Sequence, residues 1–328
     1  MLAQLPTPLE PADRLGAALA LPPGRLWVKR DDCTGLATGG NKVRKLRLFA
    51  ADALATGCDV LVTAGGPQSN HARATAAAAA KAGLGCVLVF NSEPPARTEA
   101  NQLLDVIFGA DRRFVGTMAM EELNAVVDRI GDELRDQGRR PYVIPVGGSS
   151  ALGASAYATA AEEILADLGH DDVLVITASA SGGTQAGLAA RLGHDRVLGI
   201  DTGALADPAP AIQRLTVEVA ERLELPAPSA EPRLVRDQIG DGYGAATPDC
   251  LSAIRLAART EGLLLDPVYS GKAMAGLMAL PRSELQARAV VFLATGGVPS
   301  LFGARYEPWL SGPEDARTTH ETHHPSAV

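Results

Sequence analysis

The chain of 328 residues has the composition of a globular protein, with 46% hydrophobic and 21% charged residues, and its length suits one large or two ordinary domains. Its formal net charge of -8 argues against a nucleic acid partner, because such partners need a basic protein surface. No segment approaches the about 20 apolar residues of a membrane span, and residues 1–15 carry prolines and acids where a secretory signal has an apolar core. We therefore expect a cytoplasmic protein that acts on a small molecule, without a membrane or nucleic acid partner.

Short β-branched segments recur along the chain, and each is followed by a helical pattern. The expected strands are residues 59–64, 86–90, 142–146, 173–179, 196–200 and 290–295. Because fully apolar strands between helices are typical of a parallel sheet covered on both faces, we predict an α/β fold. The strands are more numerous than one compact unit usually carries, so we expect two open, twisted parallel-sheet domains covered by helices, with the ligand in the cleft between them.

The stretch GGNKVRKL at residues 39–46 opens a predicted helix that begins with the cations Lys42, Arg44, Lys45 and Arg47. Cations are disfavoured at the positive end of a helix dipole unless an anion lies nearby. The alternative is a solvated basic helix start. If Lys42 is instead partly desolvated beside fixed positive charge, it loses its proton more easily, and a Schiff base with an aldehyde cofactor requires such a neutral amine.

Glycine-rich turns fall at the carboxyl ends of the expected strands, where open α/β sheets bind ligands. They span residues 63–71, 145–153, 178–187 and 294–300. In the third turn, Ser181, Gly182, Gly183 and Thr184 stand at the start of a predicted helix. Backbone N–H groups and the helix dipole would converge there on one point, which favours an anion. The alternative is an ordinary strand-to-helix turn.

Several nucleotide and hydrolase motifs are absent from the sequence. It has no GxGxxG with an acid at a following strand end, no GxxxxGK followed by Ser or Thr, and no GxSxG. A small phosphorylated cofactor therefore fits better than a nucleotide, and an α/β-hydrolase triad is disfavoured.

The cysteines and the carboxyl-terminal histidines do not suggest a metal site. Cys33, Cys58, Cys86 and Cys250 are scattered without metal-ligand spacing, so we expect free thiols. His320, His323 and His324 cluster in a polar, aperiodic segment, for which a frayed tail is the better interpretation.

Seven segments in order resemble the D-cysteine desulfhydrase and 1-aminocyclopropane-1-carboxylate deaminase family, within the tryptophan synthase β-like, fold type II group of pyridoxal phosphate enzymes. They are KRDDCTGLATGGNKVRKL, AGGPQSNH, YVIPVGGSSALGA, ASGGTQAGL, GDGYG, EGLLLDPVYSGKAMAGL and FLATGGVPSLF. The resemblance implies a larger cofactor-binding domain from residues 1–45 and 153–311, a smaller α/β domain from residues 46–152, a disordered tail over 312–328, and a homodimer.

The same resemblance implies which residues hold pyridoxal 5'-phosphate. Lys42 would carry it as a Schiff base, and Lys45, one helical turn on, would lie close to its phosphate. The residues that would bind the phosphate are Ser181, Gly182, Gly183 and Thr184. Asn70 would hydrogen-bond the phenolic oxygen of the cofactor, and Thr295 would meet its pyridine nitrogen.

Five further residues would face the substrate. Ser69, and with it Gln68 and His71, would approach the substrate carboxylate, while Tyr243 and Tyr269 would approach from the larger domain. Structural alternatives exist for each type: a helix N-cap for the serine, packing for the histidine and a core edge for the tyrosines.

The implied reaction is β-elimination from a small amino acid, most simply D-cysteine, to pyruvate, ammonia and sulfide. L-cysteate or a β-chloro amino acid would use the same apparatus. The cyclopropane deaminases have glutamate where this chain has Ser270, so ring opening is disfavoured. Gly66, Pro67 and Ser150 also depart from the family pattern and bear on substrate choice. The alternative from another class is a non-catalytic, nucleotide-binding α/β protein.

Overall fold

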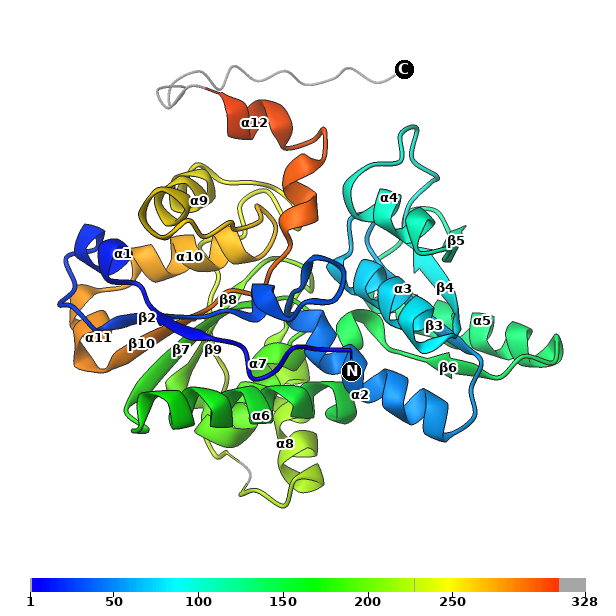
Figure 1. The fold of residues 1–328 in the computed structure, drawn as a ribbon, viewed down its shortest axis with the longest axis horizontal. Coiled ribbons are helices and arrows are strands. Elements are labelled where there is room, and N and C mark those ends of the chain that lie inside the picture. Colours follow the sequence, from blue (N-terminus) through cyan, green and yellow to red (C-terminus); the bar gives the residue numbers. More distant parts are fainter. Residues whose placement is uncertain (1, 227, 313–328) are drawn as a thin grey trace.

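The protein folds around two β-sheets, as a computed structural model describes for residues 2–226 and 228–312 (Figure 1). Within these residues, the larger sheet has six strands in the order β1-β2-β10-β7-β8-β9, and the smaller sheet has four in the order β5-β4-β3-β6. Helices cover the sheets, which confirms the predicted α/β class.

The larger sheet draws its strands from both ends of the described chain. Its strands are β1 (Leu9–Pro11), β2 (Leu26–Lys29), β7 (Val173–Ser179), β8 (Val197–Asp201), β9 (Arg233–Val235) and β10 (Ala289–Leu293). All neighbours pair in parallel except β1, which runs antiparallel to β2 at the sheet edge. The strand predicted over 173–179 is found with those bounds, whereas β1, β2 and β9 were not predicted.

The smaller sheet comes from one continuous part of the chain. Its strands are β3 (Val60–Gly65), β4 (Gly85–Phe90), β5 (Asp111–Phe114) and β6 (Pro141–Val143), and all of them pair in parallel. β5 was not predicted, because its sequence DRRF has none of the apolar character of its neighbours. β6 is shorter than predicted, since the N–H of Val146, which would make the next ladder bond, donates to Asn124 Oδ1 at 2.9 Å instead.

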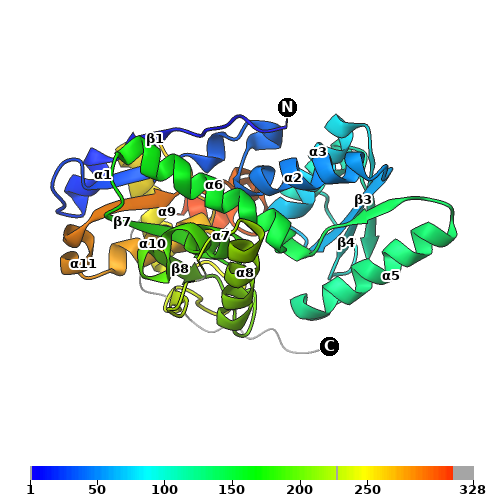
Figure 2. The same ribbon diagram turned by 90° about the horizontal axis from the view of Figure 1, so that it is seen from below.

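Helices on opposite faces bury alternate residues of the strands. The helices are α1 (Asp13–Ala18), α2 (Asn41–Ala55), α3 (Asn70–Ala82), α4 (Ala100–Ile107), α5 (Leu123–Asp136), α6 (Ala151–Leu168), α7 (Gly183–Leu192), α8 (Ala209–Arg222), α9 (Pro248–Glu261), α10 (Ser270–Ala279), α11 (Arg282–Ala287) and α12 (Glu307–Ser311). Leu174 and Ile176 of β7 pack under α1, α9 and α10, whereas Val173 and Val175 pack against α6 and α7 (Figure 2). In the smaller sheet, α2 and α3 cover one face and α5 covers the other. This alternation explains why the strands are apolar throughout.

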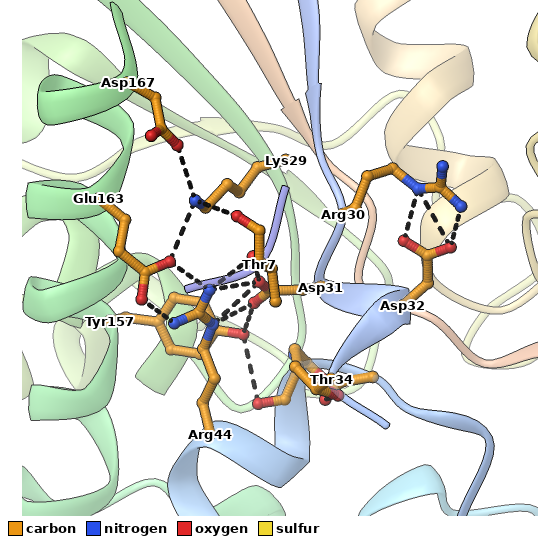
Figure 3. A network of polar contacts seen from close by, with 12 residues as sticks. Thr7, Lys29, Arg30, Asp31, Asp32, Thr34, Arg44, Tyr157, Glu163 and Asp167 are labelled. Carbon is orange, nitrogen blue, oxygen red and sulfur yellow. Dashed lines mark hydrogen bonds and ion pairs between the residues drawn. The ribbon is translucent and has the colours of Figure 1, made fainter. Parts of the chain in front are cut away.

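A buried polar network joins β2, α2 and α6 behind the start of α2 (Figure 3). Arg44 Nε donates to both carboxylate oxygens of Asp31 at 2.9 Å, and its terminal nitrogens reach Glu163 at 2.8 and 2.7 Å. The hydroxyls of Tyr157 and Thr7 donate to the same Asp31 at 2.6 and 2.9 Å. For Arg44, the anion that the sequence pattern predicted is therefore a carboxylate of the protein itself. Arg47 is exposed to solvent, so Lys42 and Lys45 remain to be explained.

We propose that each sheet is the centre of one domain. The strands of the smaller sheet lie between residues 60 and 143, and those of the larger sheet lie on either side of that segment. The predicted boundary at residues 45 and 46 falls inside α2, so this helix would belong to both domains.

The remaining sequence predictions concern thiols, metals and membranes. All four cysteines are free, as predicted. Across residues 2–226 and 228–312, no group of three His, Cys, Asp or Glu side chains is arranged to hold a metal ion. In the same part of the chain, no helix combines the length and the apolar character needed to cross a membrane. His320, His323, His324 and nearly all of the predicted tail lie outside the described residues.

The crossing of α6 and α7 depends on Gly187. A Cβ at this position would overlap the carbonyl oxygen of Ala154 and come 2.6 Å from Cβ of Tyr157. Alanine normally stabilises a helix interior relative to glycine, but here the backbone of α6 must move. We expect Gly187→Ala to lower the free energy of unfolding by about 1–3 kcal/mol, measured by urea denaturation. Gly16→Ala in α1 is the control, because its Cβ would meet Leu26 Cβ at 3.7 Å and Leu21 Cβ at 3.9 Å, which are ordinary van der Waals contacts. Equal stability of the two variants would contradict the prediction.

Candidate active site

A cavity of about 290 Å³ lies between the two sheets, at the carboxyl ends of β3 and β7 where the sequence predicted a ligand site. Its lining includes ten of the thirteen predicted site residues, namely Lys42, Ser69, Asn70, His71, Ser181, Gly182, Thr184, Tyr243, Tyr269 and Thr295. Gln68, Lys45 and Gly183 do not line it. Residues more than 200 positions apart in sequence thus meet in one cleft, as both sheets contribute to its walls.

Lys42 enters this cavity from the first turn of α2. The turn is fixed from both sides, because the N–H of Gly40 donates to the Asp31 carbonyl and the N–H of Asn41 donates to the Thr295 carbonyl, each at 3.0 Å. The Lys42 amine lies 3.3 Å from the carbonyl oxygen of Gly147. Burial lowers its pKa to about 8, so a substantial fraction of this amine is neutral near physiological pH.

Lys45 lies one turn further along α2 and is fully buried. Its amine donates to the same Gly147 carbonyl at 3.2 Å, and burial together with the charge of Lys42 lowers its pKa well below the usual range. Among the described residues, neither amine has a carboxylate within ion-pair distance. Two desolvated amines without a counter-ion make this part of the site suited to an anion.

The turn at residues 181–184 opens α7 directly beside these amines. Gly182 has φ 80°, a left-handed conformation that favours glycine, and it forms the N-cap of the helix. A Cβ on Gly183 would come 2.7 Å from the Lys45 amine and 2.8 Å from Ser149 Oγ, so only glycine leaves the space open. The free N–H groups of the first helical turn, the hydroxyls of Ser181 and Thr184, and the amine of Lys45 together form a cradle that fits a phosphate group.

Ser69 and Asn70 begin α3 on the opposite wall. Ser69 Oγ accepts the N–H of Ala72 at 3.1 Å and so caps the helix, while the residue also lines the cavity. Ser69 can therefore act as a helix N-cap and face the cavity at the same time. Asn70 Oδ1 accepts from Asn101 Nδ2 at 3.1 Å, which leaves its amide nitrogen free to donate.

Gln68 turns its side chain away from the cavity. Its Oε1 accepts the N–H of Asn101 at 2.9 Å, and its Nε2 donates to the Glu99 carbonyl at 3.3 Å. In this position Gln68 holds the segment before α4 and does not face the substrate space that the sequence suggested for it.

His71 is buried and neutral. Thr63 Oγ1 donates its single proton to the Ile144 carbonyl at 2.8 Å, so the 3.0 Å contact between Thr63 and His71 assigns the ring proton to Nε2. Burial and the charges of Lys42 and Lys45 lower the pKa of His71 well below its usual value. Nδ1 is therefore an acceptor, and His71 offers no positive charge to a substrate carboxylate.

Tyr243 and Tyr269 meet at the far side of the cavity. Their hydroxyl oxygens are in contact, and their rings pack edge to face with centroids 6.0 Å apart. Burial raises the pKa of Tyr243 to about 12 and raises that of Tyr269 well above its usual value. Both hydroxyls are therefore protonated at neutral pH; one of them donates to the other, which leaves one proton to donate elsewhere.

Asp266 is a supporting residue that the sequence reasoning missed. One carboxylate accepts the N–H groups of Val268, Tyr269 and Ser270 at 2.9, 3.0 and 2.8 Å, and thereby holds the start of α10. Ser270 donates its hydroxyl to the same carboxylate at 2.7 Å and does not line the cavity. Thr295, which the resemblance places at the pyridine nitrogen, does line the cavity.

Other lining residues were also missed, and they differ in how well the sequence signalled them. Asn41 bridges to Thr184 Oγ1 at 3.2 Å, and Ser149 Oγ donates to Ser181 Oγ at 2.8 Å. Both lie inside glycine-rich stretches that the sequence already marked. Glu121, Asn124 and Arg214 lie in segments without any motif, so only the fold could reveal them.

The comparisons with known proteins agree with this geometry. Residues 1–296 match the family described as pyridoxal-phosphate dependent enzyme. The chain is 43% identical over 321 residues to a protein named D-cysteine desulfhydrase from Klebsiella pneumoniae subsp. pneumoniae, covering 93% of this chain and 95% of that protein.

Solved structures show the same fold. The ACC deaminase homologue has a TM-score of 0.86 at 35% identity, covering 94% of each chain. The processed form of threonine deaminase isoform 2 from Solanum lycopersicum has a TM-score of 0.64 at 17% identity, covering 93% of this chain and 82% of the other, and this likeness shows the fold alone. The family match over most of the chain and the close relative lead to one conclusion: the protein belongs to the family of pyridoxal-phosphate dependent enzymes.

Proposed function

We propose that this protein is a β-eliminating lyase that converts D-cysteine to pyruvate, ammonia and sulfide. The observation that carries the proposal is the Lys42 amine, whose pKa burial lowers to about 8, in one cavity with the anion cradle at residues 181–184. The relative that is 43% identical is named D-cysteine desulfhydrase, which supports the choice of substrate.

The cradle residues would hold the phosphate of the cofactor. Ser181, Gly182, Gly183 and Thr184 would supply N–H and hydroxyl donors, and Lys45 would supply the charge. Asn70 would donate to the phenolic oxygen, and Thr295 would lie at the pyridine nitrogen. When bound, pyridoxal phosphate withdraws electrons from the α-carbon of the amino acid attached to it.

Lys42 would then act as the base of the reaction. Its amine, once released from the cofactor, would take the α-proton of the substrate onto Nζ, and the same desolvation that lowers its pKa makes it neutral for this step. Ser69 would bind the substrate carboxylate, and the protonated hydroxyls of Tyr243 and Tyr269 would face the substrate from the opposite wall.

Two related activities compete with the proposed one. L-cysteate or another β-substituted amino acid would use the same residues. The fit of the β-substituent against the cavity wall would then determine which of these amino acids reacts. Ring opening of 1-aminocyclopropane-1-carboxylate is less well supported, although a solved relative is titled an ACC deaminase homologue. The residue at the glutamate position of those deaminases is Ser270, and its hydroxyl is used by Asp266.

We also propose that the protein is a cytoplasmic homodimer. The resemblance to the family supports this assembly, and light scattering on the purified protein tests it. A monomeric mass would contradict the dimer without affecting the proposed reaction, because all the site residues named above lie within one chain.

The substrate assignment is tested by pyruvate release from matched D- and L-amino acids. We expect D-cysteine to react fastest in a panel with L-cysteine, L-cysteate, β-chloro-D-alanine and 1-aminocyclopropane-1-carboxylate. Lys42→Ala should lower the rate by about 100-fold or more, because a general base is lost. A protein that binds the cofactor but is inactive on D-cysteine would contradict the proposed activity while leaving the cofactor site intact.

Ser69 and Ser150 provide a matched pair of helix caps. Each side chain accepts a hydrogen bond at the start of its helix, so each alanine variant should lose about 1 kcal/mol of stability. Of the two serines, only Ser69 lines the cavity. We therefore expect that Ser69→Ala raises KM by about 10-fold or more and that Ser150→Ala does not, because Ser69→Ala would lose a hydrogen bond to the charged carboxylate of the substrate. Equal KM values in the two variants would mean that Ser69 does not bind the substrate.

The lowered pKa of Lys42 predicts how cofactor uptake depends on pH. Only the neutral amine attacks the aldehyde, so the rate of uptake by the cofactor-free protein should rise about tenfold per pH unit and level off above pH about 8. The visible absorption band of the bound cofactor measures this rate, and Lys42→Ala should give no band. A simple lysine peptide, mixed with the cofactor in the same buffers, corrects for ionisation of the cofactor. A rate that still rises towards pH 10.5, as for an ordinary lysine, would contradict the burial of this amine.

A further inference from the structure

Lys272 is a fully buried cation that has no part in the site described above. It lies in α10, three residues after Tyr269. Its amine is 2.7 Å from the carbonyl oxygen of Ile239, 3.2 Å from that of Gly242 and 3.5 Å from that of Thr202. No carboxylate of the described residues lies within ion-pair distance of this amine. Lys272 is thus a positive charge surrounded by backbone oxygens.

The three carbonyls belong to two loops that pack against each other at Gly203 and that this amine bonds together. Thr202 follows β8, whereas Ile239 and Gly242 belong to the irregular segment between β9 and α9. Tyr243 follows directly in that segment and reaches the cavity. The amine of Lys272 therefore connects α10, whose N-cap residue is Tyr269, with the backbone that carries Tyr243.

The segment around Tyr243 has few other supports. Gly240 and Gly242 have φ of 65° and 135°, backbone conformations that favour glycine. Because glycine has no side chain that could pack, these two residues do not hold the segment in place themselves. The hydroxyl of Tyr306 donates to the Gly244 carbonyl at 2.7 Å and ties the segment on its far side. Between these points, the bonds from Lys272 to the Ile239 and Gly242 carbonyls hold the backbone next to Tyr243, together with the packing of Gly203 against it and the bond from the Ala245 N–H to the Gly242 carbonyl at 3.1 Å.

An ammonium group matches this environment better than any neutral group would. It carries three N–H donors, and three carbonyl oxygens lie around it. Without the amine, three acceptors would be left without this donor in a buried space, which is unfavourable. Rings of backbone carbonyls also bind potassium ions, whose hydration shell they replace.

We propose that Lys272 is a positioning residue whose ammonium serves as a built-in cation, holding the Tyr243 segment so that the Tyr243 hydroxyl meets that of Tyr269 in the cavity. The effect on activity rests on the proposed function, in which both tyrosines face the substrate. The effect on the backbone does not.

The first test measures the backbone directly. Lys272→Met keeps the length of the side chain and removes the charge and the donors. We expect amide hydrogen exchange to become faster in residues 236–244 and to stay unchanged in residues 181–184, which Lys272 does not contact. Lys29→Met is the control, because Lys29 is another buried lysine that donates to a carbonyl, that of Thr7 at 2.7 Å, far from this segment. Unchanged exchange in residues 236–244 of Lys272→Met would overturn the proposal.

A double-mutant cycle then asks whether Lys272 acts through Tyr243. We expect Lys272→Met to lower kcat between about two-fold and 100-fold in the wild-type background and much less in a Tyr243→Phe background. The visible band of the bound cofactor should be retained in all variants, because Lys272 touches neither Lys42 nor the cradle. The same fold-loss of kcat in both backgrounds would mean a general structural role and would also overturn the proposal.

Ion rescue covers the case in which Lys272→Met does not fold. Lys272→Ala leaves a space lined by the three carbonyls, and we expect potassium or ammonium chloride to raise its melting temperature more than tetramethylammonium chloride at equal ionic strength. The wild-type protein should show no such preference. Equal effects of the three salts on Lys272→Ala would argue against a cation site. Because melting needs no substrate, this result stands even if the proposed reaction is wrong.

Discussion

The start of α2 imposes a charge constraint on which the rest of the site depends. Lys42 and Lys45 bring two amines into a desolvated cleft, and the first turn of α7 adds its positive dipole end to the same point. The described protein residues provide no carboxylate for them. An anionic cofactor would relieve this imbalance, and the desolvation lowers the pKa of Lys42 to about 8 and so keeps its amine partly neutral. In the proposed function, one electrostatic arrangement would thus serve both binding of the phosphate and reactivity of the amine.

The fold withstands this imbalance because the opposite face of α2 is firmly held. Arg44 lies on that face, where Asp31 and Glu163 neutralise it, and Tyr157 donates to Asp31 and to the Asn41 carbonyl. Asn41 directly precedes Lys42, so the network fixes the point from which the reactive side chain extends. Helix α2 therefore carries two kinds of buried cation. Arg44 is paired with carboxylates on one face, whereas Lys42 and Lys45 on the other face have no carboxylate within ion-pair distance among the described residues.

Carboxylates and cations away from the cofactor determine the substrate side of the cavity. Asp266 accepts the N–H groups that begin α10, including that of Tyr269, while Lys272 donates to the carbonyl oxygens of Ile239 and Gly242 and, as proposed above, would position Tyr243. Neither residue lines the cavity. The substrate wall is thus built from an irregular segment that buried charged groups hold in place.

The α/β class, the apolar strands and the glycine-rich turns could be predicted from the sequence, because they depend on local periodicity and on backbone conformations that only glycine adopts readily. Most of the predicted site residues could also be found in this way, since Lys42, Ser69 and the turn at 181–184 lie in segments with local signals. The orientation of Gln68 away from the cavity, the neutral acceptor state of His71 and the internal ion pairs of Arg44 became visible in the three-dimensional structure alone. The structure also revealed the short strands β1, β5 and β9, whose pairing depends on neighbours distant in sequence. These features follow from contacts between remote segments, and no local pattern encodes which partner a buried polar group will find.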